Sequence, residues 1–87
     1  MHNPFGDAHL DLEYPCEWAY KIVGRDEEAM QLAVAMVLDR EYRLKPSNKS
    51  KTGKYLSLEI VLTVTSEEDR RGVGQALHDR EEILFVI

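Results

Sequence analysis

Residue types that could do chemistry fall at three places in this chain, the first being the run Ser50–Lys54. Its sequence, Ser-Lys-Thr-Gly-Lys, looks like part of a phosphate-binding loop. Such a loop needs an earlier glycine, a serine or threonine directly after its lysine, and a helix that follows. Here Tyr55 comes next, at the start of an alternating, strand-like segment. We therefore interpret residues 47–53 as a polar hairpin turn.

The second place is a set of metal-ligating residue types, His2, His9, Cys16 and His78. The histidines lack the i, i+4 spacing that puts two ligands on one helix face, and a single cysteine excludes a zinc site built on cysteine pairs. We expect no metal site and no cofactor.

The third place is Arg25, which follows Gly24 directly after the first expected strand. Acylphosphatases, which share the fold predicted below, bind their substrate with an arginine at this place. Three carboxylates follow immediately at residues 26–28 and would repel a phosphate. Hydrolysis at Arg25 is therefore the weakest of our hypotheses, and we expect a protein without catalytic residues.

Charge is unevenly spread along the chain. Residues 40–54 carry a net charge of +5, whereas the whole chain carries −5, so the remainder sums to −10. An acidic body argues against general affinity for nucleic acid, yet the basic hairpin is the one place where an anion or RNA could bind. Its alternative is a solvated basic surface. The candidate ligand-binding residues are Lys21, Lys45, Lys49, Lys51, Lys54 and Tyr55.

Length and composition indicate one small domain. At 87 residues the chain has room for a single modest core. We divide it into a loose acidic leader, residues 1–13, and one domain, residues 14–87. We expect a cytoplasmic protein without a membrane segment, because the sequence shows neither a secretory signal nor a long apolar run.

Apolar periodicity predicts four strands and two helices. Period-two alternation indicates strands, and Pro46 confines its strand to a sheet edge. Ser66-Glu67-Glu68-Asp69 matches a helix capping box. The expected elements are strand 17–23, helix 26–40, strand 43–47, strand 54–65, a second helix from residue 66, and strand 83–87.

The helices are expected to bury one stripe each. The first stripe comprises Ala29, Leu32, Ala33, Met36 and Val37, and the second comprises Val73, Ala76 and Leu77. The β-α-β-β-α-β order predicts a ferredoxin-like α+β domain. It has a four-stranded antiparallel sheet in the order 4-1-3-2 with both helices on one face.

Two segments resemble the YbeD-like family of small bacterial proteins. One is the opening strand, residues 14–24, and the other is the central hairpin, residues 45–49 followed by residues 54–60. The resemblance implies an ACT-like, ferredoxin-like binding or regulatory module without assigned catalytic residues. The chain departs from the family pattern in its acidic leader and in Gly72 and Gly74.

Our leading hypothesis is a regulatory or adaptor module that binds a protein partner, a small ligand or a second copy of itself. The last expected strand is apolar on both faces and lies at a sheet edge, where exposed apolar surface usually becomes covered. A homodimer could cover it, and so could the leader. The residues concerned are Ile83, Leu84, Phe85, Val86 and Ile87.

Overall fold

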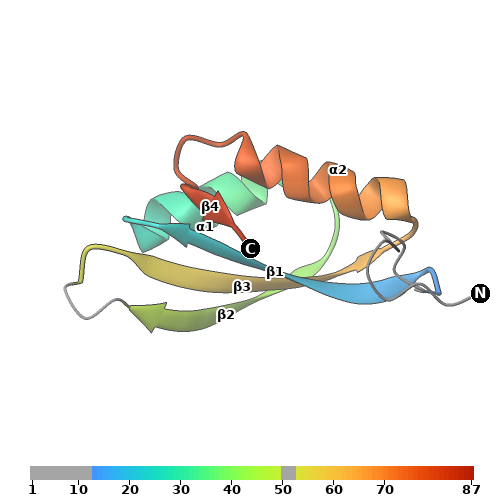
Figure 1. The fold of residues 1–87 in the computed structure, drawn as a ribbon, viewed down its shortest axis with the longest axis horizontal. Coiled ribbons are helices and arrows are strands. Elements are labelled where there is room, and N and C mark those ends of the chain that lie inside the picture. Colours follow the sequence, from blue (N-terminus) through green and yellow to red (C-terminus); the bar gives the residue numbers. More distant parts are fainter. Residues whose placement is uncertain (1–12, 50–52) are drawn as a thin grey trace, which may run out of the picture.

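The computed structural model describes residues 13–49 and 53–87 and shows six elements in the expected order (Figure 1). The elements are β1 (Cys16–Gly24), α1 (Glu27–Val37), β2 (Tyr42–Lys49), β3 (Leu56–Val64), α2 (Glu67–His78) and β4 (Phe85–Val86).

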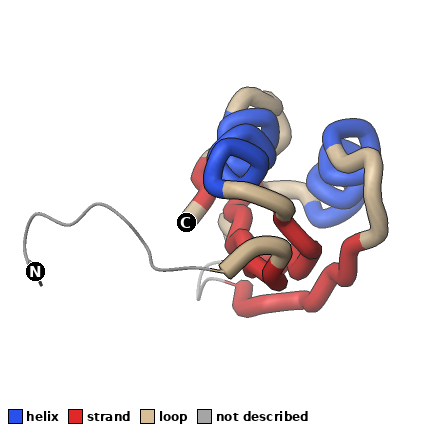
Figure 2. The backbone as a smooth tube through the Cα atoms, turned by 90° about the vertical axis from the view of Figure 1, so that its right-hand side faces the viewer, coloured by secondary structure: helices blue, strands red, loops and turns tan. Residues whose placement is uncertain are grey.

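The strands form one antiparallel sheet in the order β2-β3-β1-β4. This is the predicted order 4-1-3-2 read from the other side, and both helices cover the same face (Figure 2). The predicted ferredoxin-like α+β fold is therefore confirmed. Pro46 lies in the edge strand β2, next to a register irregularity, where a missing N–H is tolerated.

The core lies between the sheet and the helices. On β3 the helix-facing positions Leu58, Ile60, Leu62 and Val64 are buried, as the alternation predicted. Ser57 and Val61, on the opposite face of this strand, are buried as well. β1 contributes Tyr20 and Ile22 to the same layer. The opposite face of the sheet carries no helix (Figure 2) and holds the charged residues of the strands.

Helix α1 differs from the prediction in its length and in the stripe it buries. Its C-cap is Leu38, in extended conformation, so the helix ends before Arg40. The buried residues are Met30, Ala33 and Val34, whereas Leu32 and Met36 are 60% and 71% exposed. The predicted stripe is confirmed at Ala33, which is buried, and at Val37, which packs against the core, but it is wrong at Leu32 and Met36. The reason is that α1 is apolar nearly all round, so two stripes with the same helical spacing are available.

Helix α2 begins as predicted. The hydroxyl of Ser66 accepts the N–H of Asp69 at 2.9 Å, as the serine of a capping box does. The Asp69 carboxylate does not close that box and instead accepts the N–H of Thr65 at 2.9 Å. Val73 and Leu77 are buried and Ala76 is half-buried, as expected.

The last strand is shorter than predicted. β4 contains two residues, because Ile83 donates its N–H to the carbonyl of Arg80 in a turn and enters the core at 4% exposure. β2 in turn is longer than expected and runs to Lys49. Residues 1–12 of the proposed leader lie outside the described part of the chain. Among the described residues, no helix has both the length and the apolarity needed to cross a membrane.

Candidate functional site

Strand β4 covers β1 at one end only. Two residues of β4 pair with Ile22 and Val23, and the N–H and C=O of Lys21 bond with Ile87 at 3.3 and 2.7 Å. From Cys16 to Tyr20, no other strand of the described chain lies beside β1 on that side (Figure 1). On its other side, β1 pairs with β3 along its whole length.

Every second residue of this uncovered edge points its backbone polar groups away from β3. In an antiparallel ladder, the N–H and C=O of a residue point to the same side, and those of alternate residues share that side. Because Lys21 uses both groups toward β4, the groups of Ala19 and Glu17 point the same way. We call this stretch, residues 16–20, the free edge of β1. An extended chain that continued the line of β4 would meet hydrogen-bonding groups along it.

A groove of about 420 Å³ lies between the free edge and helix α2. Trp18 and Tyr20 line it from β1, and Arg70, Gly74 and His78 line it from α2. The end of β4 closes one end of the groove. The groove therefore borders the edge at which a further strand could pair.

Arg70 is held in place at the wall of this groove. Its guanidinium carbon lies 4.9 Å from the centre of the Trp18 ring, and its Nε donates to the hydroxyl of Tyr14 at 3.2 Å. The hydrogen bond with Tyr14 raises the pKa of Arg70 above its ordinary value. The side chain is 15% exposed, so its charge stands at a defined position.

Tyr20 ties β1 to α2 at the same place. Its hydroxyl donates to the backbone carbonyl of Arg70 at 2.5 Å, and burial raises the pKa of Tyr20 to about 12. A Cβ atom on Gly74 would lie 3.4 Å from the Tyr20 ring, at ordinary van der Waals distance, so α2 passes directly beside the ring at this position. The two elements that line the groove, β1 and α2, are thus joined by Tyr20.

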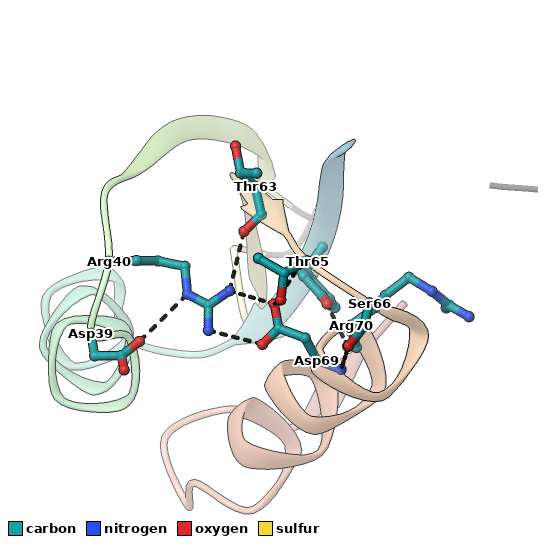
Figure 3. A network of polar contacts seen from close by, with 8 residues as sticks. Asp39, Arg40, Thr63, Thr65, Ser66, Asp69 and Arg70 are labelled. Atoms are coloured by element: carbon teal, nitrogen blue, oxygen red, sulfur yellow. Dashed lines mark hydrogen bonds and ion pairs between the residues drawn. The ribbon is translucent and has the colours of Figure 1, made fainter. Parts of the chain in front are cut away.

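A second polar cluster fixes the start of α2 (Figure 3). The Arg40 guanidinium donates to both carboxylate oxygens of Asp69, at 2.6 and 2.9 Å, and to the carbonyl of Thr63 at 3.1 Å. Asp39 contacts the same guanidinium at 3.4 Å. These bonds join the α1–β2 connection to the end of β3 and the first turn of α2. This cluster stabilises the fold, and its residues do not line the groove.

The ion pair sets the protonation of both partners. Hydrogen bonds from Arg40 and from the Thr65 backbone hold the pKa of the Asp69 carboxyl well below its usual range. The same carboxylate raises the pKa of Arg40. Asp69 therefore stays ionised throughout the range in which proteins normally work.

The predicted anion-binding residues do not form one cluster. Lys21 and Lys45 both pair with Glu59 across β3, so a carboxylate lies between them. Tyr55 lies four residues away along that segment, about 13 Å, with the guanidinium carbon of Arg25 5.7 Å from its ring centre. Lys54 is exposed beside it. Lys51 and the side chain of Lys49 lie outside the described residues.

Other residues singled out in the sequence take ordinary positions. His78 is 64% exposed and lies 3.8 Å from Asp79, and Cys16 is half-buried. Within residues 13–49 and 53–87, no three side chains of metal-ligating type come together. His2 and His9 fall outside the described residues.

The proposed self-association segment divides into two parts. Ile83 is a core residue, whereas Leu84, Phe85 and Ile87 are 36%, 59% and 76% exposed. Phe85 pairs with Val23, on the sheet face that carries no helix. The exposed part of this segment adjoins the free edge of β1.

The free edge of β1 and the position of Arg70 beside it could not be predicted from the sequence. Trp18 and Arg70 are 52 positions apart, and no local pattern connects them. The one available signal was the mismatch between a long first strand and a short last one. That mismatch is hidden when the final apolar run, residues 83–87, is taken as a full strand.

The comparisons place the chain in a family. The family model described as "Protein of unknown function (DUF493)" matches residues 10–87, and the chain belongs to this family, which confirms the YbeD-like resemblance. The "UPF0250 protein NE1487" of Nitrosomonas europaea is 27% identical over 81 residues, covering 87% of this chain and 93% of that protein. The "Uncharacterized protein Cj0253" of Campylobacter jejuni is 35% identical over 75 residues, covering 85% and 86%.

A solved structure agrees with the fold. The solution structure of HP0495 from Helicobacter pylori matches with a TM-score of 0.79 at 20% identity, covering 100% of this chain and 97% of that one. At this identity the match establishes the fold alone.

Proposed function

We propose that this protein is a non-catalytic adaptor that binds an extended segment of a partner protein as an additional strand beside β1. The observation that carries the proposal is the free edge of β1 beyond the end of β4. An extended peptide gains affinity from main-chain hydrogen bonds to such an edge and specificity from the pockets beside it. The role needs no catalytic residue, metal or cofactor.

The surroundings of the free edge support this role. The groove under α2 can take side chains on one side of an added strand, and the exposed Ile87 offers apolar contact on the other. Exposed edges with apolar side chains tend to attract a further strand. A second copy of the chain is the alternative occupant and would give a dimer.

The test is an NMR titration of the full ¹⁵N-labelled chain with capped hexapeptides of alternating valine and a polar residue. We expect chemical-shift changes at residues 16–21 and slower hydrogen exchange of the Ala19 amide. Ala19→Pro removes the outward N–H without removing a bond inside the sheet, so it should weaken binding roughly tenfold. Ala19→Thr keeps the N–H and serves as its control at the same position.

Three results would overturn or redirect the proposal. No shift at the free edge with any peptide would reject strand addition. Equal binding by the proline and threonine variants would show that backbone pairing is not involved. A dimer in light scattering that Ala19→Pro abolishes and Ala19→Thr retains would make a second copy the occupant.

A further inference from the structure

We infer that the partner segment carries an acidic side chain, which Arg70 and Arg71 bind in the groove beside the free edge. This inference rests on the proposed function and adds the chemistry of the partner to it. Its basis is the charge of the groove. The ionisable side chains that line it are Arg70, Arg71, His78 and Tyr20, with no aspartate or glutamate among its described lining residues.

The charge of the groove differs from that of the rest of the helical layer. Residues 26–40 and 66–82, which contain both helices, hold ten carboxylates and four arginines. Within this acidic layer, the groove is a place where cationic side chains gather without an aspartate or glutamate among the described lining residues. An anionic side chain is the complementary ligand for such a place.

Arg70 is preorganised to bind a carboxylate. Its stacking on Trp18 and its bond to Tyr14 fix the guanidinium, and that bond is its one side-chain hydrogen bond to the residues described. Glu67 lies 3.8 Å from its NH2 group, beyond hydrogen-bond distance. The terminal nitrogens therefore retain donors for the paired hydrogen bonds that arginine forms with carboxylates.

Arg71 supplies a second, adjustable charge. It is 66% exposed and its described ion pair is with Glu67, four residues earlier on α2, at 3.0 Å. Exposed pairs of this kind contribute little to stability, so the guanidinium can turn toward a ligand at small cost. Arg71 can thus be replaced without unfolding the protein.

The register determines which side chain of the partner is acidic. A strand in line with β4 alternates its side chains between the helix layer, where Val86 points, and the open face, where Phe85 and Ile87 lie. The partner residue opposite Trp18 therefore faces Arg70, whereas the residue opposite Ala19 lies on the open face. The expected partner segment has an acidic residue opposite Trp18 and an apolar residue opposite Ala19.

Trp18 provides a direct measurement because it is the only tryptophan in the chain. We would titrate the full chain with three capped hexapeptides, of alternating valine and glutamate, valine and glutamine, or valine and lysine. Indole fluorescence and the amide shifts of β1 would report binding. We expect the glutamate peptide to bind roughly tenfold more tightly than the glutamine peptide, and the lysine peptide to bind more weakly than either.

Arg71→Gln and Arg25→Gln form a matched pair of variants. Both remove one exposed arginine, but Arg71 lines the groove and Arg25 lies at the far end of β1, over Tyr55. The preference for glutamate should fall about threefold or more in Arg71→Gln and stay unchanged in Arg25→Gln. An equal loss in both variants would point to the overall charge and would overturn the inference.

The remaining outcomes separate the two proposals. Equal affinity for the glutamate and glutamine peptides, with shifts at the free edge, would overturn the acidic partner and leave strand addition standing. Absence of any shift at β1 would overturn both. Nuclear Overhauser contacts between the Trp18 indole and residues 1–12 would show the chain's own acidic leader in the groove and would overturn a partner in trans.

Discussion

At the scale of single residues, the molecule depends on pairs that are distant in sequence. Arg40 and Asp69 are 29 positions apart and form a two-point ion pair. The sequence predicted Asp69 as part of a helix cap, and its cap position is confirmed by the bond between its N–H and Ser66. The partner of its carboxylate could not be predicted, because that contact depends on how the α1–β2 connection meets α2.

Replacement of Asp69 should show what this pair contributes. We expect Asp69→Asn to lower the free energy of unfolding at pH 7 by about 2 kcal/mol. The substitution weakens the charge-assisted hydrogen bonds from Arg40 and the hydrogen bond from the backbone N–H of Thr65. Asp39→Asn touches the same guanidinium from a side chain that is 87% exposed, so it should change stability by less than about 0.5 kcal/mol. Urea unfolding of both variants measures the difference. Equal effects would contradict the assigned role of Asp69.

The same ion pair predicts a pH dependence. The folded pKa of Asp69 lies below its unfolded value of about 3.9. Its contribution to stability is therefore complete above that unfolded pKa and is lost as the pH falls toward the folded pKa. Wild type should lose more stability than Asp69→Asn between pH 5 and pH 2, so their unfolding curves should converge in acid. A constant difference over this range would contradict the prediction.

At the scale of elements, periodicity predicted which segments are helices and strands better than it predicted which face each element buries. The single apolar face of β3 was predicted because its opposite face is polar at most positions. The stripe of α1 was wrong at Leu32 and Met36, because these two residues have the same spacing as the residues that are buried. Only contact with the sheet decides between two apolar stripes, and the sequence carries no local signal for it.

The two glycines of α2 should respond differently to alanine. A Cβ atom on Gly72 would meet only open space, whereas a Cβ on Gly74 would lie 3.4 Å from the Tyr20 ring. Gly72→Ala should therefore raise the free energy of unfolding by about 0.5–1 kcal/mol, the usual gain in helix propensity. Gly74→Ala should gain somewhat more, because its methyl group would also make ordinary van der Waals contact with Tyr20. Thermal unfolding of both variants tests the order, and a smaller gain at Gly74 than at Gly72 would contradict it.

At the scale of the whole molecule, charge is separated between the two layers. The helical layer has an excess of acids, whereas the strands and the described part of the hairpin, residues 16–24, 42–49 and 53–64, hold five basic and two acidic residues. The sequence showed a basic hairpin in an acidic chain. Folding places this hairpin at one end of a sheet whose open face carries both acidic and basic side chains. Glu17 and Arg43, for example, form an ion pair there at 2.9 Å.

This arrangement makes a specific prediction about RNA. Because Glu59 lies between Lys21 and Lys45, the open face presents no continuous cationic track for a phosphate backbone. We expect single-stranded RNA to bind weakly at low salt and not detectably at about 150 mM salt, where few phosphate contacts survive. Glu59→Gln should strengthen the low-salt binding several-fold by removing the central carboxylate, and fluorescence anisotropy with a short labelled RNA measures both. Tight binding by the wild type at about 150 mM salt, with shifts at Tyr55, would instead make the hairpin a nucleic-acid site.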